Sequence, residues 1–324
     1  MSSYSPAWWL PGAHAQTMWG KLFRRETPQP TERIRWNTPD GDFVDLHRLP
    51  SSEPEAPRLL ILHGLEGTIR SHYAQGLLSE ARRRGWAADM LIFRSCGDEL
   101  NVTRRFYHSG ETTDLSFVVD RILGESPTQP LLAAGVSLGG NVLLKYLGEK
   151  NDAVSPRLKA AAAISVPFDL ARSSRHINRG FAKVYQRHFI RSLKRKTIAK
   201  LERFPDLVDR EELSRIQTMY EFDEFLTAPL HGFSGADDYY VRSSSLGWLG
   251  RISIPTLLFN AVDDPFLPPN VLEDVRKISA SNPALEIDFP AHGGHAGFIA
   301  GSNPLRPFYY AERRVCEFLA NRLT

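Results

Sequence analysis

Residues 135–139, Gly-Val-Ser-Leu-Gly, have the types and spacing of a site built around a nucleophilic serine. An apolar run precedes them at 131–134 and a helical pattern follows from Asn141, so the sequence predicts a strand, a sharp turn and a helix. Glycine on both sides leaves room for the strained backbone that a serine adopts at such a turn. The helix N-terminus would place N–H groups and positive potential where an oxyanion forms beside Ser137. The alternative is an ordinary turn in which the serine caps the helix.

Two aspartates follow a later apolar run and are candidates for orienting a histidine. A serine hydroxyl needs a base within hydrogen-bond reach, and the base needs an acid to orient it. Asp263 and Asp264 follow the run that begins at Leu257, in the chain order serine, acid, histidine. Asp264 is predicted to be the orienting acid, because the turn fixed by Pro265 and Pro268 would aim it at the histidine. Asp263 is predicted to hold the loop, and an acidic turn without a catalytic role is the alternative.

The candidate bases are two histidines in a glycine-rich loop after the strand predicted at 285–290. His295 is predicted to be the base, because Gly293 and Gly294 let its backbone approach the serine. His292 is the alternative. The two histidines and the two aspartates could also form a metal site, but no helical His-x-x-x-His pair and no cysteine cluster supports it.

A second glycine-rich turn is predicted to complete an oxyanion site. The apolar run 58–62 ends at His63-Gly64-Leu65-Glu66-Gly67, a turn in which backbone N–H groups can approach a substrate closely. We predict that the backbone N–H groups of Leu65 and Leu138 bind the oxyanion. A plain turn between strand and helix is the alternative.

The elements that must position these residues alternate between strand and helix from residue 58 to residue 166. Continuous apolar runs are typical of inner strands, so the sequence predicts an α/β fold with a mostly parallel central sheet flanked by helices. The alternation stops at Pro167 and resumes at Ile254, which predicts a helical cap insertion at 168–250 between core segments 1–167 and 251–324. Residues 1–30 are rich in tryptophan and are expected to pack on the core, or to wall the pocket or touch a lipid surface.

Basic residues recur every three or four positions within the predicted insertion, as one stripe of a helix would show. They are Arg172, Arg175, Arg179, Lys183, Arg187 and Arg191, beside an apolar stripe of Phe181, Val184, Tyr185, Phe189 and Ile190. One interpretation is a solvated face that acidic residues in 206–212 partly neutralise. The other is a face that contacts an anionic membrane surface or attracts an acidic substrate.

Net charge and cysteine content limit the kinds of partner and the cellular compartment that we expect for this protein. The 324 residues carry a net charge of only +3, so we predict no nucleic-acid binding. Two cysteines are too few for a disulfide scaffold and fit a reducing compartment. Cys96 is expected to be a packed free cysteine, with a reactive thiol near the pocket as the alternative. The sequence shows neither a signal peptide nor an apolar run of membrane-spanning length, so a soluble cytoplasmic protein is expected. Composition does not predict the oligomeric state.

With these motifs in place, the sequence resembles the α/β-hydrolase superfamily. Within it, the sequence is similar to the YheT-like hydrolases (AB hydrolase 4 family), the branch that also holds the ABHD acylglycerol and phospholipid lipases. The matching stretches are 8–17 (Trp-Trp-Leu-Pro-Gly-Ala-His-Ala-Gln-Thr), 63–67, 107–112, 135–141, 260–266 and 292–298. The chain departs from the family at 94–98, where Arg-Ser-Cys-Gly-Asp replaces Arg-Gly-Cys-Ser-Gly. This loop is near the expected pocket, so the departure bears on substrate choice.

The resemblance implies a triad of Ser137, Asp264 and His295. Residues and resemblance together predict a serine hydrolase that cleaves carboxylic esters, of short-chain or acylglycerol type, with no cofactor and no metal. The expected partner is a small-molecule ester, lipid-like substrates included. One alternative is a non-catalytic protein of the same fold that binds a lipid or small ligand. The other is an enzyme that cleaves thioesters or amides.

Overall fold

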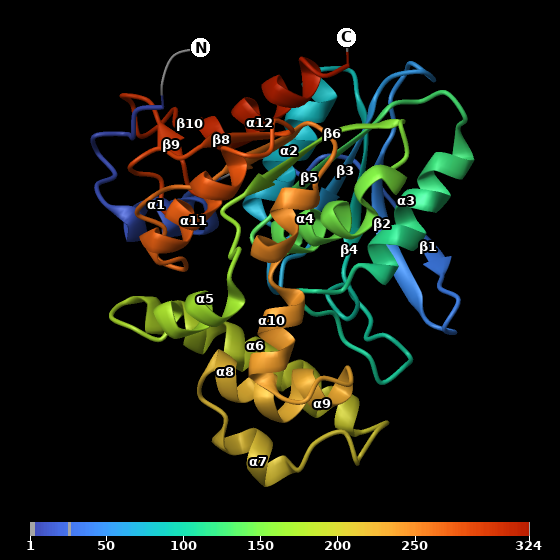
Figure 1. Ribbon diagram of the computed structural model, residues 1–324, viewed down its shortest axis with the longest axis vertical. Helices are drawn as coiled ribbons and strands as arrows, with labels where there is room; N and C mark the ends of the chain where they lie inside the picture. Colours follow the sequence, from blue (N-terminus) through green and yellow to red (C-terminus); the bar gives the residue numbers. More distant parts are fainter. Residues whose placement is uncertain (1–3, 25–26, 324) are drawn as a thin grey trace.

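The computed structural model describes residues 4–24 and 27–323, which form an eight-stranded sheet with helices on both faces and a group of helices beyond one edge (Figure 1). The strand order is β1-β2-β4-β3-β5-β6-β7-β8. The strands are β1 (Glu32–Asn37), β2 (Phe43–Leu49), β3 (Arg58–Leu62), β4 (Ala87–Ile92), β5 (Leu131–Val136), β6 (Leu158–Ile164), β7 (Thr256–Phe259) and β8 (Leu285–Asp288). β2 is antiparallel to both β1 and β4, and the neighbouring strands from β4 to β8 are parallel.

Helices cover the sheet on both faces, as the alternation of patterns requires. α2 (His72–Arg83) and α12 (Tyr310–Ala320) pack together on one face. α3 (Thr113–Glu125), α4 (Leu138–Lys150) and α11 (Pro269–Ser279) lie on the other, with a 3₁₀ turn η1 (Asn151–Ala153) after α4. The inner strands β4 and β5 are buried along their whole length, which explains their continuous apolar runs. The predicted α/β fold is confirmed.

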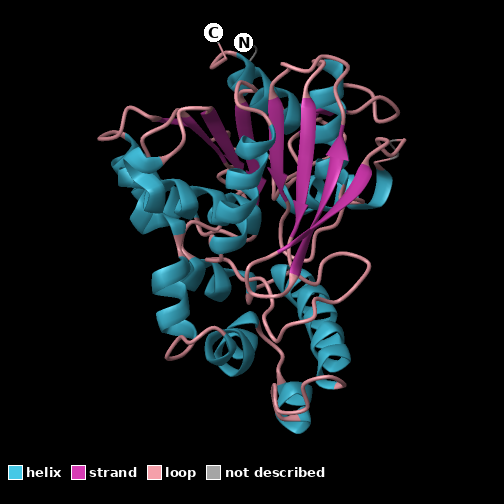
Figure 2. Ribbon diagram, turned by 90° about the vertical axis from the view of Figure 1, so that its right-hand side faces the viewer, coloured by secondary structure: helices cyan, strands magenta, loops and turns pink. Residues whose placement is uncertain are grey.

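The chain between β6 and β7 forms helices in place of further strands, and all of its residues are described (Figure 2). They are α5 (Leu170–Ile177), α6 (Ala182–Leu201), α7 (Arg210–Arg215), α8 (Met219–Phe222), the π-helix η2 (Asp223–Thr227), α9 (Ala228–Leu230), α10 (Ala236–Ser243) and the 3₁₀ helix η3 (Ser245–Arg251). We call α5 to α10 the insertion. It has two small apolar clusters of its own, apart from the core of the sheet. η3 instead packs on α4 and α11, which are helices of the core. The bounds 168–250 predicted for the insertion include most of η3, so they stay a proposal.

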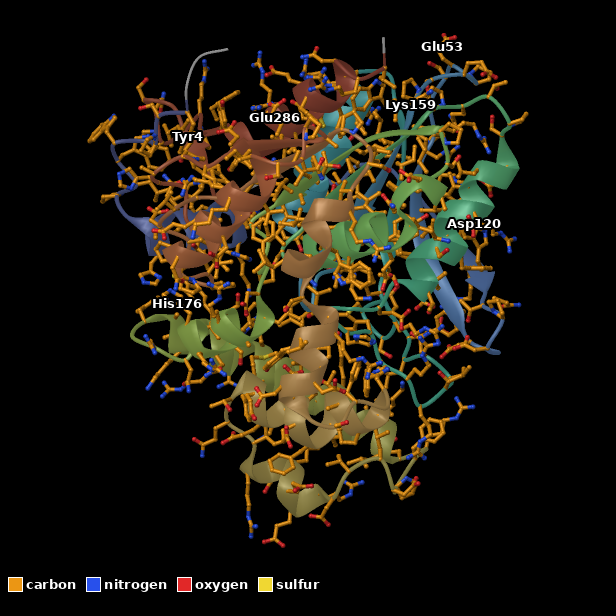
Figure 3. All side chains as sticks on the ribbon, viewed as in Figure 1. Tyr4, Glu53, Asp120, Lys159, His176 and Glu286 are labelled. Carbon is orange, nitrogen blue, oxygen red and sulfur yellow. The ribbon has the colours of Figure 1, made fainter. Side chains whose placement is uncertain are left out.

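The insertion lies at the carboxyl end of the parallel strands. Figure 3 labels Lys159, at the start of β6, near the top of the molecule, and His176, in α5, at mid-height where the insertion begins, so β6 runs toward the insertion. Side chains at the ends of β3, β5 and β7 therefore face the insertion, and this is the edge at which ligands bind in open α/β sheets.

One prediction for the insertion is wrong, because the basic stripe is divided between two helices. α5 ends at Ile177 and α6 begins at Ala182, and between them Gly180 has a φ of 50°. A left-handed glycine ends a helix and redirects the chain, and the three-to-four spacing of the basic residues continues across that break by coincidence. Phe181 and Val184 of the predicted apolar stripe are also exposed, whereas Ile190 is buried.

The N-terminal segment packs against the end of the chain. The N–H of Ala7 donates to the carbonyl of Ile299 at 2.9 Å, and the side chain of Gln16 in α1 (Ala13–Phe23) accepts from the N–H of Ile299 at 2.7 Å. Ile299 belongs to a short sheet of β9 (Ile299–Ala300) and β10 (Phe308–Tyr309). Residues 1–3 and 25–26 of the predicted segment 1–30 lie outside the described residues.

Candidate active site

Ser137 occupies the sharp turn between β5 and α4. Its φ is 54°, in the left-handed region that side-chain-bearing residues rarely adopt. A Cβ placed on Gly135 would lie 2.5 Å from the carbonyl oxygen of Gly139, and a Cβ on Gly139 would lie 2.5 Å from that of His63. Glycine is required at both positions, and the turn holds Ser137 at the carboxyl end of a central strand.

His295 lies between Ser137 and Asp264. Its Nε2 is 2.9 Å from the Oγ of Ser137, and its Nδ1 is 2.9 Å from Oδ2 and 3.1 Å from Oδ1 of Asp264. The carboxylate of Asp264 is buried, and the N–H of Phe266 donates to its Oδ1 at 2.8 Å. The ring of Phe266 stacks on the imidazole with centroids 4.0 Å apart. The three residues form one hydrogen-bonded chain that ends at the serine hydroxyl.

The other aspartate and the other histidine form a separate pair. Oδ2 of Asp263 is 3.2 Å from Nδ1 of His292, and its Oδ1 accepts from the N–H of Gly294 at 2.9 Å. His292 is exposed at the surface. Asp263 therefore fixes the loop that carries His295, and the structure brings neither Asp263 nor His292 to the serine.

Two supports of this histidine loop were not found from the sequence. The N–H of His295 donates to Oγ1 of Thr17 at 2.9 Å, and the N–H of Ala296 donates to Oγ of Ser165 at 2.9 Å. Thr17 lies in α1, 278 residues away in the chain, so the N-terminal segment helps to position the histidine. The motif around residues 8–17 was visible, but nothing in it indicates which distant loop it contacts.

The turn after β3 is held so that one N–H group stays available. The N–H of Gly64 donates to the hydroxyl of Tyr73 at 2.9 Å, and the N–H of Glu66 donates to that of Tyr107 at 2.8 Å. Among the described residues no acceptor is bonded to the N–H of Leu65. Leu138 opens α4, where the first N–H groups of a helix have no partner within it. Both leucines line the cavity that contains Ser137.

A cavity of about 870 Å³, counting space open to solvent, joins this site to the insertion. Core residues form one end, among them Leu65, Ser137, Leu138 and His295. The insertion supplies most of the apolar wall, with Leu170, Ile177, Phe189, Leu193, Met219 and Phe222. Such a wall suits an acyl chain or another apolar substituent next to a reacting carbonyl.

Glu66 connects the turn after β3 to helix α6. Its Oε1 lies 2.7 Å from Nζ of Lys196 and accepts a hydrogen bond from the hydroxyl of Tyr107 at 2.9 Å. Nζ of Lys196 is also 3.3 Å from Sγ of Cys96. Cys96 is a buried free cysteine, as predicted, and burial raises its pKa to about 11, so the thiol is protonated and unreactive near neutral pH.

The departure from the family pattern at 94–98 has a conformational cost. Ser95 stands where the family pattern has glycine, and its φ is 62°. The carboxamide oxygen of Asn101 accepts from the N–H of Ser95, and Arg94 beside it is buried in contact with Asp114 and Asp40. These contacts hold the strained backbone in place, and none of residues 94–98 is among those that line the cavity containing Ser137.

Within residues 4–24 and 27–323 the structure shows no group of three or more His, Cys, Asp or Glu side chains that could hold a metal ion. None of the helices in that part of the chain has both the length and the apolar composition needed to cross a membrane.

Strand, strained serine turn, helix and a distant His–Asp pair at the carboxyl edge of a parallel sheet define the α/β-hydrolase class. The α/β hydrolase fold family matches residues 57–302, and the chain belongs to that family. Within it the chain is YheT-like: it is 38% identical to "Putative esterase YheT" from Escherichia coli, over 96% of this chain and 91% of that protein.

Two further comparisons agree with this family. Phospholipase ABHD3 of Mus musculus is 28% identical over 98% of this chain and 78% of its own length, and the monoacylglycerol lipase of Saccharomyces cerevisiae is 30% identical over 83% and 60%. The solved Pyrococcus furiosus esterase Pf2001 has a TM-score of 0.61 at 16% identity, covering 94% of this chain and 98% of its own, which shows the shared fold.

Proposed function

We propose that this protein is a carboxylic ester hydrolase in which Ser137 is the nucleophile, His295 the general base and Asp264 the orienting acid. The observation that carries the proposal is the unbroken hydrogen-bonded chain from Asp264 through His295 to the hydroxyl of Ser137. A protein that only binds a ligand needs no such chain, because its three groups serve proton transfer and not affinity.

The steps follow from this geometry. Asp264 accepts from Nδ1–H of His295, so Nε2 is free to take the proton of Ser137 as its Oγ attacks the acyl carbon. The N–H groups of Leu65 and Leu138 donate to the resulting oxyanion. The bond to the alcohol oxygen then breaks, and His295 gives that oxygen its proton. Water next loses a proton to His295 and attacks the acyl-enzyme; the bond to Oγ of Ser137 breaks, His295 returns the proton to that oxygen, and the acid is released.

The ester class rests on the relatives, which are named as an esterase, a phospholipase and a monoacylglycerol lipase. The mostly apolar cavity supports a substrate with an acyl chain, of short-chain or acylglycerol type. Thioesters and amides would react through the same acyl-enzyme, so a substrate panel must include them. The expected location is the cytoplasm, where the two buried free cysteines, Cys96 and Cys316, would stay reduced.

The first experiment is labelling of purified protein with a fluorophosphonate probe, which reacts with activated serines. We expect wild type and Ser279→Ala, a serine outside the cavity, to be labelled and Ser137→Ala not to be labelled. In the Ser137→Ala variant, kcat/KM for p-nitrophenyl esters should fall by about three orders of magnitude or more. Unimpaired turnover in that variant would exclude the mechanism, and absence of labelling in folded wild type would favour a non-catalytic binding protein.

The insertion is also proposed to contact anionic membranes through α6. Lys183, Arg187, Arg191 and Arg195 lie at its surface, and within the described part of the chain none has an acidic side chain within ion-pair distance. The predicted neutralisation by 206–212 does not occur through ion pairs, since Asp206 pairs with Arg104 and Glu211 with Arg215. Exposed Val184 and Ile198 on the same helix, and Phe181 directly before it, could enter the headgroup region.

Sedimentation with vesicles of phosphatidylcholine and phosphatidylglycerol tests this contact. Binding should rise with the anionic lipid, fall with salt and be lost in the double variant Arg187→Glu, Arg191→Glu. Lys159→Glu, at the opposite end of the molecule, is the control and should bind as wild type does. No binding at low salt would end the membrane proposal without touching the hydrolase proposal.

A further inference from the structure

A buried carboxyl group in the wall of the cavity has no hydrogen bond to Ser137, His295 or Asp264. Asp223 begins the π-helix η2, and its residue lines the same cavity as Ser137. The residue is only 7% exposed. Single-turn π-helices recur at functional sites because they shift a side chain out of the regular helical register. In η2 this irregularity occurs at Asp223, which is the one acidic residue of the insertion that lines the cavity.

Asp223 has two hydrogen-bond donors but no cation. Oδ1 accepts from the hydroxyl of Thr227 at 2.7 Å, and Oδ2 accepts from that of Tyr240 at 2.8 Å. Among the described residues no lysine, arginine or histidine lies within ion-pair distance of it. A carboxylate has about four acceptor positions, so two remain for a further donor. A buried carboxyl group without a cation destabilises a protein, which argues against a purely structural role.

The surroundings favour a donor or a cation as the missing partner and disfavour an anion. Neither lysine nor arginine is among the residues that line the cavity. His108 lines it as well, and burial lowers its pKa to about 4, so that imidazole is neutral near pH 7. The hydroxyl of Ser173, also in this wall, is buried and has no hydrogen-bond partner within the described chain. This part of the cavity wall therefore supplies no cation as a partner for Asp223.

We infer that Asp223 forms a recognition subsite for a hydrogen-bond donor, a hydroxyl or an ammonium group, carried by the non-reacting part of the ester. Tyr240 and Thr227 hold the carboxyl group in place, and the free oxygen positions accept from the ligand. The inference deepens the proposed function and rests on it. It implies that the preferred ester is apolar next to its carbonyl and polar further away.

Matched esters test the inference through a ratio of rates. The probes are esters of one length that end in methyl, hydroxyl, ammonium or carboxylate, with the end group placed on the acyl side in one series and on the alcohol side in another. Wild type should cleave the hydroxyl or ammonium ester with kcat/KM about tenfold above that of the methyl ester, and the carboxylate ester least. Preference for ammonium alone identifies a cationic ligand, and preference for both identifies a general donor.

Three variants separate recognition from structure. Asp223→Asn should remove any ammonium preference, and Asp223→Leu should make the methyl ester the better substrate. Glu224→Gln changes the adjacent carboxylate, whose contact is to the N–H of Ala236 and which does not line the cavity, so its ratio should equal that of wild type. If Asp223→Leu fails to fold, the isosteric Asp223→Asn decides the result for the ammonium ester, and Asp223→Ala decides it for the hydroxyl ester.

The outcomes distinguish this inference from the proposed function. A wild-type enzyme that is labelled at Ser137 and cleaves all end groups equally would overturn the subsite and leave the hydrolase intact. The same holds if both Asp223 variants keep the wild-type ratio. If wild type is not labelled and turns over none of the esters, the hydrolase proposal fails, and with it the subsite that depends on it.

Discussion

Buried carboxyl groups have different kinds of partner in the core and in the insertion. In the core, the carboxylates of Asp264 and Asp114 face a histidine and an arginine, and each loop near the serine is tied by several hydrogen bonds. In the insertion, Asp223 is buried with hydroxyl partners only. The core therefore holds its carboxylates beside cationic or imidazole groups, while the insertion keeps a carboxyl group without a cation in the cavity wall. Under the proposed function, the core would perform the reaction and the insertion would select the ligand.

The largest expected effect separates the two aspartates of the core. Asp264→Asn should reduce kcat by about three to four orders of magnitude, because an amide donor opposite Nδ1 favours the wrong tautomer of His295. Asp263→Asn should reduce it by less than about tenfold, because Asp263 only fixes the loop through Gly294 and His292. Steady-state kinetics with one p-nitrophenyl ester measures both. Equal losses would show that the two carboxylates share the orienting role.

The sequence predicted the core better than the insertion for a physical reason. Inner strands of a parallel sheet must be apolar along their length, and the serine turn tolerates only glycine at 135 and 139, so both leave a local signature. Contacts such as Thr17 to His295 leave none, because their partners are hundreds of residues apart. In the insertion, short helices and a left-handed Gly180 broke a periodicity that looked continuous. Nothing local marked Asp223 as buried.

A medium effect is expected where the two regions meet, at the contact of Glu66 with Lys196. Lys196→Met leaves the carboxylate of Glu66 without its cation and should loosen the turn that carries the N–H of Leu65. Because that N–H acts on the transition state, kcat should fall by about tenfold with little change in KM.

Arg195→Met is the matched control, since it removes a charge from the exposed side of the same helix. Its kcat should stay at the wild-type value. A change of KM alone in Lys196→Met would mean that α6 shapes the cavity without acting on the oxyanion turn, and that would weaken the contrast between a reacting core and a selecting insertion.

The smallest expected effect tests the charge state of the insertion without any substrate. Burial raises the pKa of Asp223 from 3.8 to about 7, so the folded protein binds a proton between those values that the unfolded chain does not bind. The contribution of Asp223 to wild-type stability should therefore fall as the pH rises through this window and level off above about pH 7. The side chain of Asn in Asp223→Asn does not titrate. The Tm of this variant minus the Tm of wild type should therefore be a few degrees larger at pH 8 than at pH 5. Thermal melts of the two proteins across this range measure the difference, in which the other titrating groups cancel. A difference that does not vary with pH would mean that the pKa of Asp223 is not raised, and the contrast between the insertion and the core would be lost.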